Sequence, residues 1–175
     1  MPVLYLVRHA IAAERGPKYP KDDTRPLTRV GKARMKEVVA GWRKLKPRLD
    51  LILTSPLVRA QSTAEIVRDG LRNDVPLTRF PALAPGHRPS EVAEALEKFA
   101  KLLKTGKGKG KKASVIALVG HEPDLGQLAG WLIGTKEPIP FKKGGIARID
   151  LAALPPKQNG QLIWHATPKL LRALA

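Results

Sequence analysis

The amino-acid sequence predicts an α/β fold: a three-layer sandwich with a mostly parallel central sheet and helices on both faces. Short apolar runs alternate with longer segments of helical periodicity through the first two thirds of the chain, as in parallel sheets with crossover helices. The last two apolar runs have no helical segment between them, which predicts a terminal hairpin and an antiparallel strand. The length of 175 residues, with 43% hydrophobic residues, suits one domain over residues 1–175.

The predicted strands are short runs of apolar residues that are rich in β-branched and aromatic side chains. Such runs pack well in a sheet that is covered on both faces. They extend over Val3 to Val7, Leu49 to Thr54, Pro76 to Phe80, Ser114 to Val119, Ile146 to Leu151 and Gln161 to Trp164.

The helices are predicted from capping residues and from apolar residues at three- and four-residue spacing. Thr28 is the expected N-cap of the first helix. Ser55, which is followed by a proline, is the expected N-cap of a second helix that runs to about Asp69. Ser90 is the expected cap of the third helix. A fourth helix covers residues 124–133, and a short apolar helix ends the chain.

The composition argues against several classes of protein. There is no cysteine, so neither disulfides nor thiolate chemistry is expected. No apolar run approaches the roughly 18 residues that a membrane span needs, and Met1 leads directly into a predicted strand without a signal sequence. We therefore expect a soluble, cytoplasmic protein that is a monomer and does not bind membranes.

The net charge of +17, from 32 lysines and arginines against 15 acidic residues, predicts attraction to phosphate-rich ligands. The charge alone does not distinguish between nucleic acid, nucleotide, polyphosphate and phosphoprotein, and a generally basic proteome explains it equally well. Lysines crowd the stretch from Lys104 to Lys112, but the aromatic residues that would stack on bases are missing there. We therefore interpret this stretch as a solvated connector and do not expect nucleic-acid binding.

Arginine and histidine side chains follow three of the predicted strands at the point where each strand ends. Arg8 and His9 end the first strand, and His121 follows the run that ends in LVG. Arg59 falls in the first turn of the helix after LILTSP. Because ligands of open α/β sheets bind outside the carboxyl ends of the strands, we expect these four side chains to gather at one edge, beside the free N–H groups of helix N-termini.

This combination of side chains suits a phosphoryl group. Guanidinium groups match phosphate oxygens, and a neutral imidazole can attack phosphorus and form a covalent intermediate. A second, protonated imidazole would stabilise the phosphoryl oxygens in the transition state. A metal site is not expected, because there is no cysteine and no His-x-x-x-His pair.

The motifs around these residues resemble those of the histidine phosphatase superfamily. LVRHA resembles its Arg-His-Gly signature, TSPLVRAQSTAEIV its Ser-Pro-x-x-Arg-x-x-x-Thr block, and LVGHEP the block with its second histidine. The stretch RPLTRVG, residues 25–31, resembles the small SixA-type phosphohistidine phosphatases, as do the chain length and the order of the blocks. The resemblance is weakest over residues 72–112.

The resemblance implies a phosphoglycerate mutase-like fold and a two-step hydrolysis without a metal or an organic cofactor. His9 would be the nucleophile that becomes phosphorylated, and Arg8 and Arg59 would hold the phosphoryl oxygens. His121 would bind an oxygen and stabilise the transition state, and Arg25 lies in a motif that could reach the substrate. The expected partner is a phosphorylated protein of signal transduction or a small phosphorylated molecule.

Two departures from the family pattern bear on the substrate. Position 10 is alanine instead of the usual glycine, which is a small change. Larger members commonly have a glutamate near residues 81–85 that protonates an alkoxide leaving group, whereas PALAP contains no acid. Glu122 and His87 are the alternative proton donors. Since a nitrogen leaving group needs less help from an acid than an alcohol does, the sequence favours phosphohistidine or another phosphoamidate.

Two other functions stay open at this point. One is a general phosphomonoesterase for nucleotides, polyphosphate or aryl phosphates, which the positive net charge of the protein would attract. The other is a non-enzymatic basic module that binds phosphate or nucleic acid, for which a steep salt dependence of DNA or RNA binding would be the sign.

Overall fold

The computed structural model describes residues 1–72, 74–105, 115–154 and 156–175, and it confirms the predicted fold class. Its sheet consists of β1 (Val3–Arg8), β2 (Leu51–Thr54), β3 (Leu77–Arg79), β4 (Val115–Gly120), β5 (Ile146–Asp150) and β6 (Gln161–Ala166), in the order β3-β2-β4-β1-β5-β6. Strands β1 to β4 are parallel, whereas β5 is antiparallel to both β1 and β6. The predicted terminal hairpin is therefore formed by β5 and β6.

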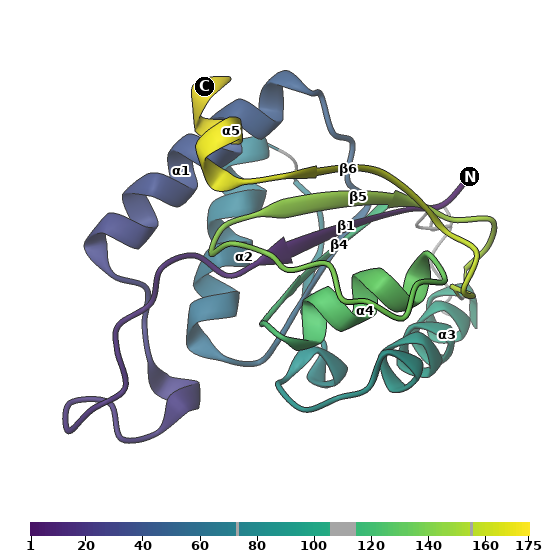
Figure 1. The fold of residues 1–175 in the computed structure, drawn as a ribbon, viewed down its shortest axis with the longest axis horizontal. Coiled ribbons are helices and arrows are strands. Elements are labelled where there is room, and N and C mark those ends of the chain that lie inside the picture. The colour runs from purple at the N-terminus through teal and green to yellow at the C-terminus, as the bar shows by residue number, and fades with distance from the viewer. Residues whose placement is uncertain (73, 106–114, 155) are drawn as a thin grey trace.

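Helices cover both faces of the sheet (Figure 1). They are α1 (Arg29–Lys44), α2 (Val58–Leu71), α3 (Pro89–Thr105), α4 (Asp124–Leu132) and α5 (Pro168–Ala173). Buried residues of α1, α2 and α5 share one hydrophobic cluster, and buried residues of α3 and α4 share the other. The two clusters lie on opposite faces of the sheet, which gives the three layers that the sequence predicts.

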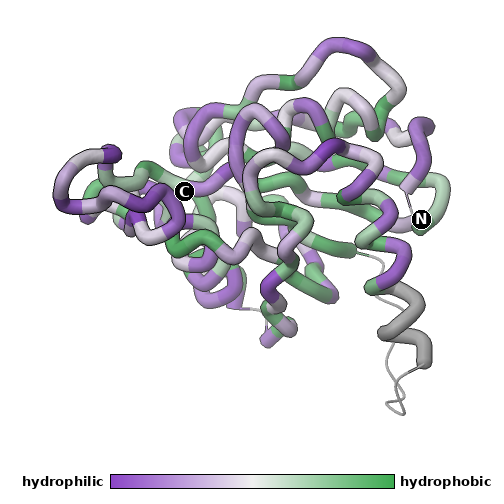
Figure 2. Tube along the Cα trace, turned by 90° about the horizontal axis from the view of Figure 1, so that it is seen from below, coloured by the Kyte–Doolittle hydropathy of each residue, from purple (hydrophilic) through white to green (hydrophobic). Residues whose placement is uncertain are grey.

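The central strand β1 is buried on both faces, because its side chains alternate between the two clusters. Leu4 and Leu6 belong to the cluster under α3 and α4, whereas Val3, Tyr5 and Val7 belong to the cluster under α1, α2 and α5. Figure 2 shows hydrophobic segments through the middle of the molecule and a mostly hydrophilic loop between β1 and α1 that projects from it. That loop supplies part of the site described below.

The first predicted helix start is confirmed and the second is wrong. The Thr28 hydroxyl accepts a hydrogen bond from the backbone N–H of Gly31 at 2.9 Å, as an N-cap does. Ser55 is not an N-cap, because α2 begins at Val58 and its N-cap is Leu57. The Ser55 hydroxyl instead lies 2.8 Å from Nε2 of His121. A side chain that we predicted to cap a helix therefore contacts a residue of the site.

The third helix also begins earlier than predicted, at Pro89, so Ser90 lies inside α3 and does not precede it. The carboxylate of Glu91 accepts a hydrogen bond from the backbone N–H of Arg88 at 2.7 Å, so this side chain satisfies a free donor at the helix start. Proline at the first helical position suits the helix, since it has no N–H that needs a partner.

The loop between β1 and α1 is closed at its base by backbone pairing. The N–H of Ala13 donates to the carbonyl of Pro26 at 2.9 Å, and the N–H of Thr28 donates to the carbonyl of Ile11 at 3.0 Å. A Cβ atom at Gly31 would lie 2.0 Å from that Ile11 oxygen, so only glycine permits this approach of α1. The pairing holds residues 14–25 together as one loop beside the end of β1.

The lysine-rich stretch Lys104–Lys112, predicted to be a solvated connector, lies largely outside the described residues. In the part of the chain that the structure describes, no helix combines the length and the apolar character that crossing a membrane requires.

Candidate active site

The two histidines meet because the strands that precede them are neighbours. Strands β1 and β4 run parallel with Arg8 opposite Gly120, so the chain leaves both strands at the same edge of the sheet. The backbone N–H of His9 donates to the carbonyl of Gly120 at 3.0 Å. The ring centroids of His9 and His121 are 5.1 Å apart. The sequence prediction that these strand ends converge is therefore confirmed.

A cavity of about 330 Å³ opens at this edge. It contains both histidines, the two arginines expected beside them, Arg25 and Glu122. Its lining residues are Arg8, His9, Ala12, Arg15, Asp22, Arg25, Arg59, Pro85, His121, Glu122 and Lys143. Five of these are arginines or lysines and two are carboxylates, so the cavity is built to receive an anion.

His9 is held as a neutral imidazole. Its Nδ1 lies 2.7 Å from the carbonyl oxygen of Ala10 and so carries the proton, and its Nε2 accepts a hydrogen bond from Nε of Arg59 at 3.3 Å. Burial lowers the pKa of His9 to about 4, although the bond to Ala10 opposes this effect, and the positive charges of Arg59 and Arg8 lower it further. At neutral pH the ring therefore offers a lone pair on Nε2.

Arg59 is fixed by a carboxylate from the projecting loop. Its Nη2 lies 2.7 Å from the Asp22 carboxylate, and its Nη1 donates to the Asp22 backbone carbonyl, also at 2.7 Å. The guanidinium is almost fully buried, with 4% of the side chain exposed. Asp22 therefore both neutralises Arg59 and sets the plane of its guanidinium group.

Asp22 binds two further arginines of the same loop. Arg15 Nη2 lies 3.0 Å and Arg25 Nη2 lies 2.6 Å from its Oδ1. Burial opposes the ionisation of Asp22, but the hydrogen bonds from Arg59, Arg15 and Arg25 outweigh it and hold the pKa of this carboxyl well below its usual range. Arg25 also donates to the carbonyl of Ala13 at 2.8 Å, so it ties the loop together.

Arg8 lies on the other side of the cavity and binds to backbone. Its Nη1 donates to the carbonyl of Phe141, and the backbone N–H of Phe141 in turn donates to the carboxylate of Glu122. Burial raises the pKa of Glu122, although the bond from Phe141 and the positive charge of Arg8 oppose the rise. The Nε of Arg8 is buried and has no hydrogen-bond partner, so it is a donor available to a ligand.

His121 combines one satisfied and one unsatisfied nitrogen. Nε2 lies 2.8 Å from the Ser55 hydroxyl, and Nδ1 is buried without a partner. Burial lowers the pKa of His121 to about 3, and the positive charge of Arg59 and the proximity of the titratable His9 ring lower it further. The imidazole is therefore neutral in the free protein, and its protonation beside a phosphoryl group stays a prediction.

The structure thus brings together Arg8, His9, Arg25, Arg59, His121 and Glu122 around one cavity. His87, the other predicted proton donor, is not among the lining residues; its Nδ1 lies 3.7 Å from Glu91 at the start of α3. Residues 81–83 form a short 3₁₀-helix, and Pro85 is the member of PALAP that lines the cavity. In the described part of the chain, no group of three or more histidine, cysteine or carboxylate side chains is placed to hold a metal ion.

Sequence reasoning missed Asp22, Arg15, Ser55 and Lys143 as residues of the site. Asp22 had a usable signal, because it stands seven residues after Arg15 and three residues before Arg25, with which the RPLTRVG motif begins. Lys143 had none, since it precedes β5 and the prediction placed no functional residue near that strand.

Comparisons with known proteins agree with this geometry. A family model described as the histidine phosphatase superfamily (branch 1) matches residues 4–87. An uncharacterized protein of Picosynechococcus sp. (strain ATCC 27264 / PCC 7002 / PR-6) is 34% identical over 172 residues, which cover 96% of this chain and 98% of the relative. The chain belongs to the histidine phosphatase superfamily.

Solved structures extend the likeness to the whole fold. A structure of the protein histidine phosphatase SixA complexed with tungstate is 25% identical, with a TM-score of 0.76 over 95% of this chain and 97% of that chain. A putative phosphohistidine phosphatase SixA from Agrobacterium tumefaciens is 24% identical, with a TM-score of 0.70 over 95% of this chain and 98% of that chain.

A mycobacterial glucosyl-3-phosphoglycerate phosphatase complexed with VO3 is 14% identical, with a TM-score of 0.62 over 95% of this chain and 100% of that chain. This superfamily member is therefore of the SixA type in fold, and its membership supports phosphatase activity. Because the neighbours are named for different substrates, the likeness leaves the choice of substrate to the chemistry of the cavity.

Proposed function

We propose that the protein hydrolyses phosphohistidine, or a related phosphoamidate, through a covalent intermediate on His9. The observation that carries the proposal is the state of the imidazole: neutral, with Nδ1 bonded to the Ala10 carbonyl and Nε2 beside Arg59 in a cationic cavity. A neutral imidazole nitrogen is a nucleophile for phosphorus, and surrounding guanidinium groups stabilise the phosphoryl oxygens.

In the first step, Nε2 of His9 attacks phosphorus and the P–N bond of the substrate breaks. A substrate imidazole that is protonated on its other nitrogen leaves as neutral imidazole and needs no proton from the enzyme. Arg59, Arg8 and His121 would hold the phosphoryl oxygens. Nε of Arg8 and Nδ1 of His121 are buried nitrogens without a hydrogen-bond partner in the described structure, so both can bind an oxygen. The SixA structure with tungstate, a tetrahedral oxyanion, supports an oxyanion site in this fold.

In the second step, water attacks phospho-His9, the new P–N bond breaks and inorganic phosphate leaves. Because Nδ1 keeps its proton and donates it in a hydrogen bond to the Ala10 carbonyl throughout, the His9 ring is a neutral imidazole after the P–N bond breaks. The bond to Ala10 therefore serves both steps, since it stabilises the positive charge that the ring acquires while it carries the phosphoryl group.

The acidic residues of the cavity support a nitrogen leaving group over an alcohol. Asp22 is ionised by its three arginines and cannot donate a proton near neutral pH. Glu122 is then the remaining lining carboxyl group among the described residues, and the Phe141 N–H accounts for one of its oxygens. An alkoxide needs a proton donor, which typically contributes about 10²–10⁴-fold in rate, whereas a protonated imidazole does not.

The test compares three substrates at near-neutral pH: a phosphohistidine peptide, an aryl phosphate and a simple alkyl phosphate. We expect kcat/KM to fall in that order, with the alkyl phosphate about 10²-fold or more below the peptide. His9→Ala should remove all three activities. Turnover of the alkyl phosphate above that of phosphohistidine would contradict the substrate assignment and favour a general phosphomonoesterase. The predicted monomeric state and cytoplasmic location stay predictions.

A further inference from the structure

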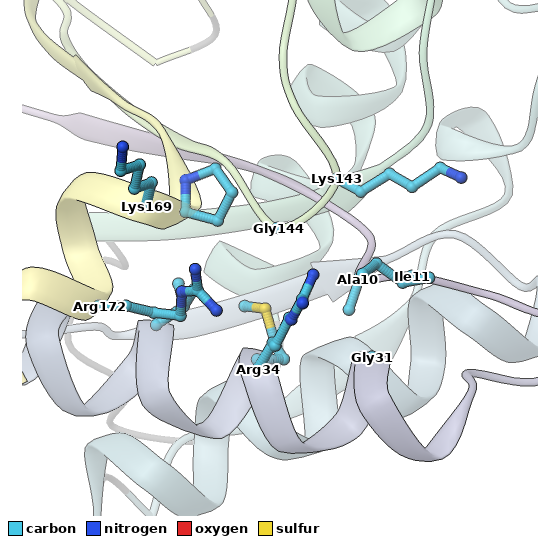
Figure 3. Close-up of a pocket in the computed structure, with 11 residues that line it drawn as sticks. Ala10, Ile11, Gly31, Arg34, Lys143, Gly144, Lys169 and Arg172 are labelled. Carbon is cyan, nitrogen blue, oxygen red and sulfur yellow. The ribbon is translucent and has the colours of Figure 1, made fainter.

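A second cavity lies between α1, α5 and the segment before β5 (Figure 3). Its volume is about 110 Å³. Apolar side chains of α1, α5 and the end of β1 line its interior: Ala10, Ile11, Met35, Val38 and Pro168. Basic side chains line it as well: Arg34, Lys143, Lys169 and Arg172. Among its described lining residues there is no carboxylate.

The second cavity adjoins the catalytic cavity. Lys143 lines both, and Ala10, which follows His9, lines the second. The backbone N–H of Gly144 donates to the carbonyls of Arg8 and His9, at 3.2 and 3.1 Å, so the segment between the cavities is bound to the catalytic backbone. Figure 3 shows Lys143 pointing away from Lys169 and Arg172. A ligand that extends along this segment could therefore contact both cavities.

The positive charges of the basic side chains in the second cavity are little neutralised by neighbouring carboxylates. Arg34, Lys143 and Lys169 are exposed, and among the described residues none of them forms an ion pair. Arg172 is 3.7 Å from the Glu37 carboxylate through Nη1, while its Nε is buried without a hydrogen-bond partner. The positive field around the cavity is therefore available to an anionic ligand.

The size of the cavity restricts what enters it. Pockets for drug-sized ligands or cofactors enclose about 300–1,000 Å³, and a cavity of about 150 Å³ holds a benzene ring. A volume of about 110 Å³ suits a single branched aliphatic side chain and excludes a nucleotide base with its sugar. An apolar interior surrounded by cations then matches a short peptide segment in which an apolar residue has acidic neighbours.

We propose that the second cavity docks an acidic segment of a phosphorylated protein substrate, with one apolar side chain inside it and carboxylates on Arg34, Lys169 and Arg172. This inference rests on the proposed function for the identity of the phosphorylated group. The docking itself does not, because it concerns residues that take no part in the chemistry.

The direct test measures binding of a fluorescent, unphosphorylated peptide with one leucine flanked by glutamates, by anisotropy at low and high salt. The variant is Arg34→Glu/Lys169→Glu. The matched control, Lys36→Glu/Lys157→Glu, changes the net charge by the same amount at exposed positions outside both cavities. We expect the variant to weaken binding about tenfold, the control less than about twofold, and the difference to shrink at high salt.

The kinetic test uses two phosphohistidine peptides, one with acidic and one with amide flanks, and an aryl phosphate. The variant should raise KM about tenfold for the acidic peptide only, with kcat and aryl phosphate turnover within about twofold of wild type. Intact aryl phosphate turnover also shows that the variant is folded. Equal losses for both peptides, or for variant and control, would overturn the docking site.

The two proposals can fail separately. If wild type cleaves aryl phosphate but neither phosphohistidine peptide, the proposed function is wrong, and selective loss of peptide binding in the variant still supports the docking site. If the variant loses affinity for a single-stranded oligonucleotide but not for the acidic peptide, the cavity belongs to a nucleic-acid surface and the docking proposal is wrong.

Discussion

The two arginines that flank His9 are held by opposite kinds of partner. Arg59 uses Nε and both terminal nitrogens, and its main partner is the ionised Asp22 of a charged, projecting loop. Arg8 binds the backbone carbonyl of Phe141, a residue packed in the core with 2% exposure. One side of the cavity therefore depends on side-chain charge, and the other depends on backbone that the core holds in place.

The largest expected effect comes from replacing each arginine with lysine. Arg59→Lys loses a planar fork that makes three hydrogen bonds, whereas Arg8→Lys can keep a single bond to a carbonyl. We expect kcat/KM to fall about 10²–10³-fold for Arg59→Lys, the effect of losing a preorganised donor, and about tenfold less for Arg8→Lys. Steady-state kinetics on the aryl phosphate measures this, and equal losses would contradict the comparison.

The next effect concerns Asp22 as a positioning residue. Asp22→Asn keeps the shape of the side chain but removes the charge that orients Arg59. We therefore expect kcat to fall about tenfold, which corresponds to about 1.4 kcal/mol of activation free energy. The cavity gains positive charge, so inhibition by inorganic phosphate should be as strong as in wild type or stronger. Weaker phosphate inhibition with unchanged kcat would show that Asp22 does not act through Arg59.

The lowered pKa of Asp22 also predicts that the free energy of unfolding depends on pH in the acid range. Its folded-state pKa is depressed, so its contribution is fully present above the unfolded value of about 3.9 and is lost as pH falls toward the lower folded value. The difference in free energy of unfolding between wild type and Asp22→Asn should be constant above about pH 5 and shrink below about pH 4. Urea unfolding of both proteins across this range measures it; a constant difference would rule out the ionised bridge.

The smallest expected effect on phosphohistidine turnover lies on the Arg8 side. Glu122→Gln keeps an oxygen that can accept the bond from Phe141, but it removes the carboxyl group that remains, besides Asp22, among the described lining residues. Phosphohistidine turnover should change less than about threefold, while the residual alkyl phosphatase activity should fall at least about tenfold, because only the alkoxide needs a proton. A comparable loss on both substrates would assign Glu122 to the main reaction.

The difference between the Arg59 side and the Arg8 side of the cavity also explains which residues of the site the sequence could predict. Arg8 ends a buried strand, and His9 and His121 directly follow buried strands, so strand periodicity and the rule for sheet edges were enough to place them together. Asp22 lies in an irregular loop whose path is set by backbone pairing near Ile11 and by three arginines, and no periodic pattern encodes such a path. The Ser55-Pro56 pair predicts a helix cap at Ser55, and its bond to His121 escapes sequence reasoning because it joins residues that are far apart in the sequence.

The central claim is that the phosphoryl group is transferred to Nε2 of His9. The most direct measurement is rapid quenching during turnover, followed by mass spectrometry of the labelled peptide and ³¹P NMR to identify the substituted nitrogen. The account predicts an acid-labile phosphate on Nε2 of His9, absent from His9→Ala. Phosphate on His121, or turnover with unlabelled His9 under conditions that trap the intermediate, would contradict it.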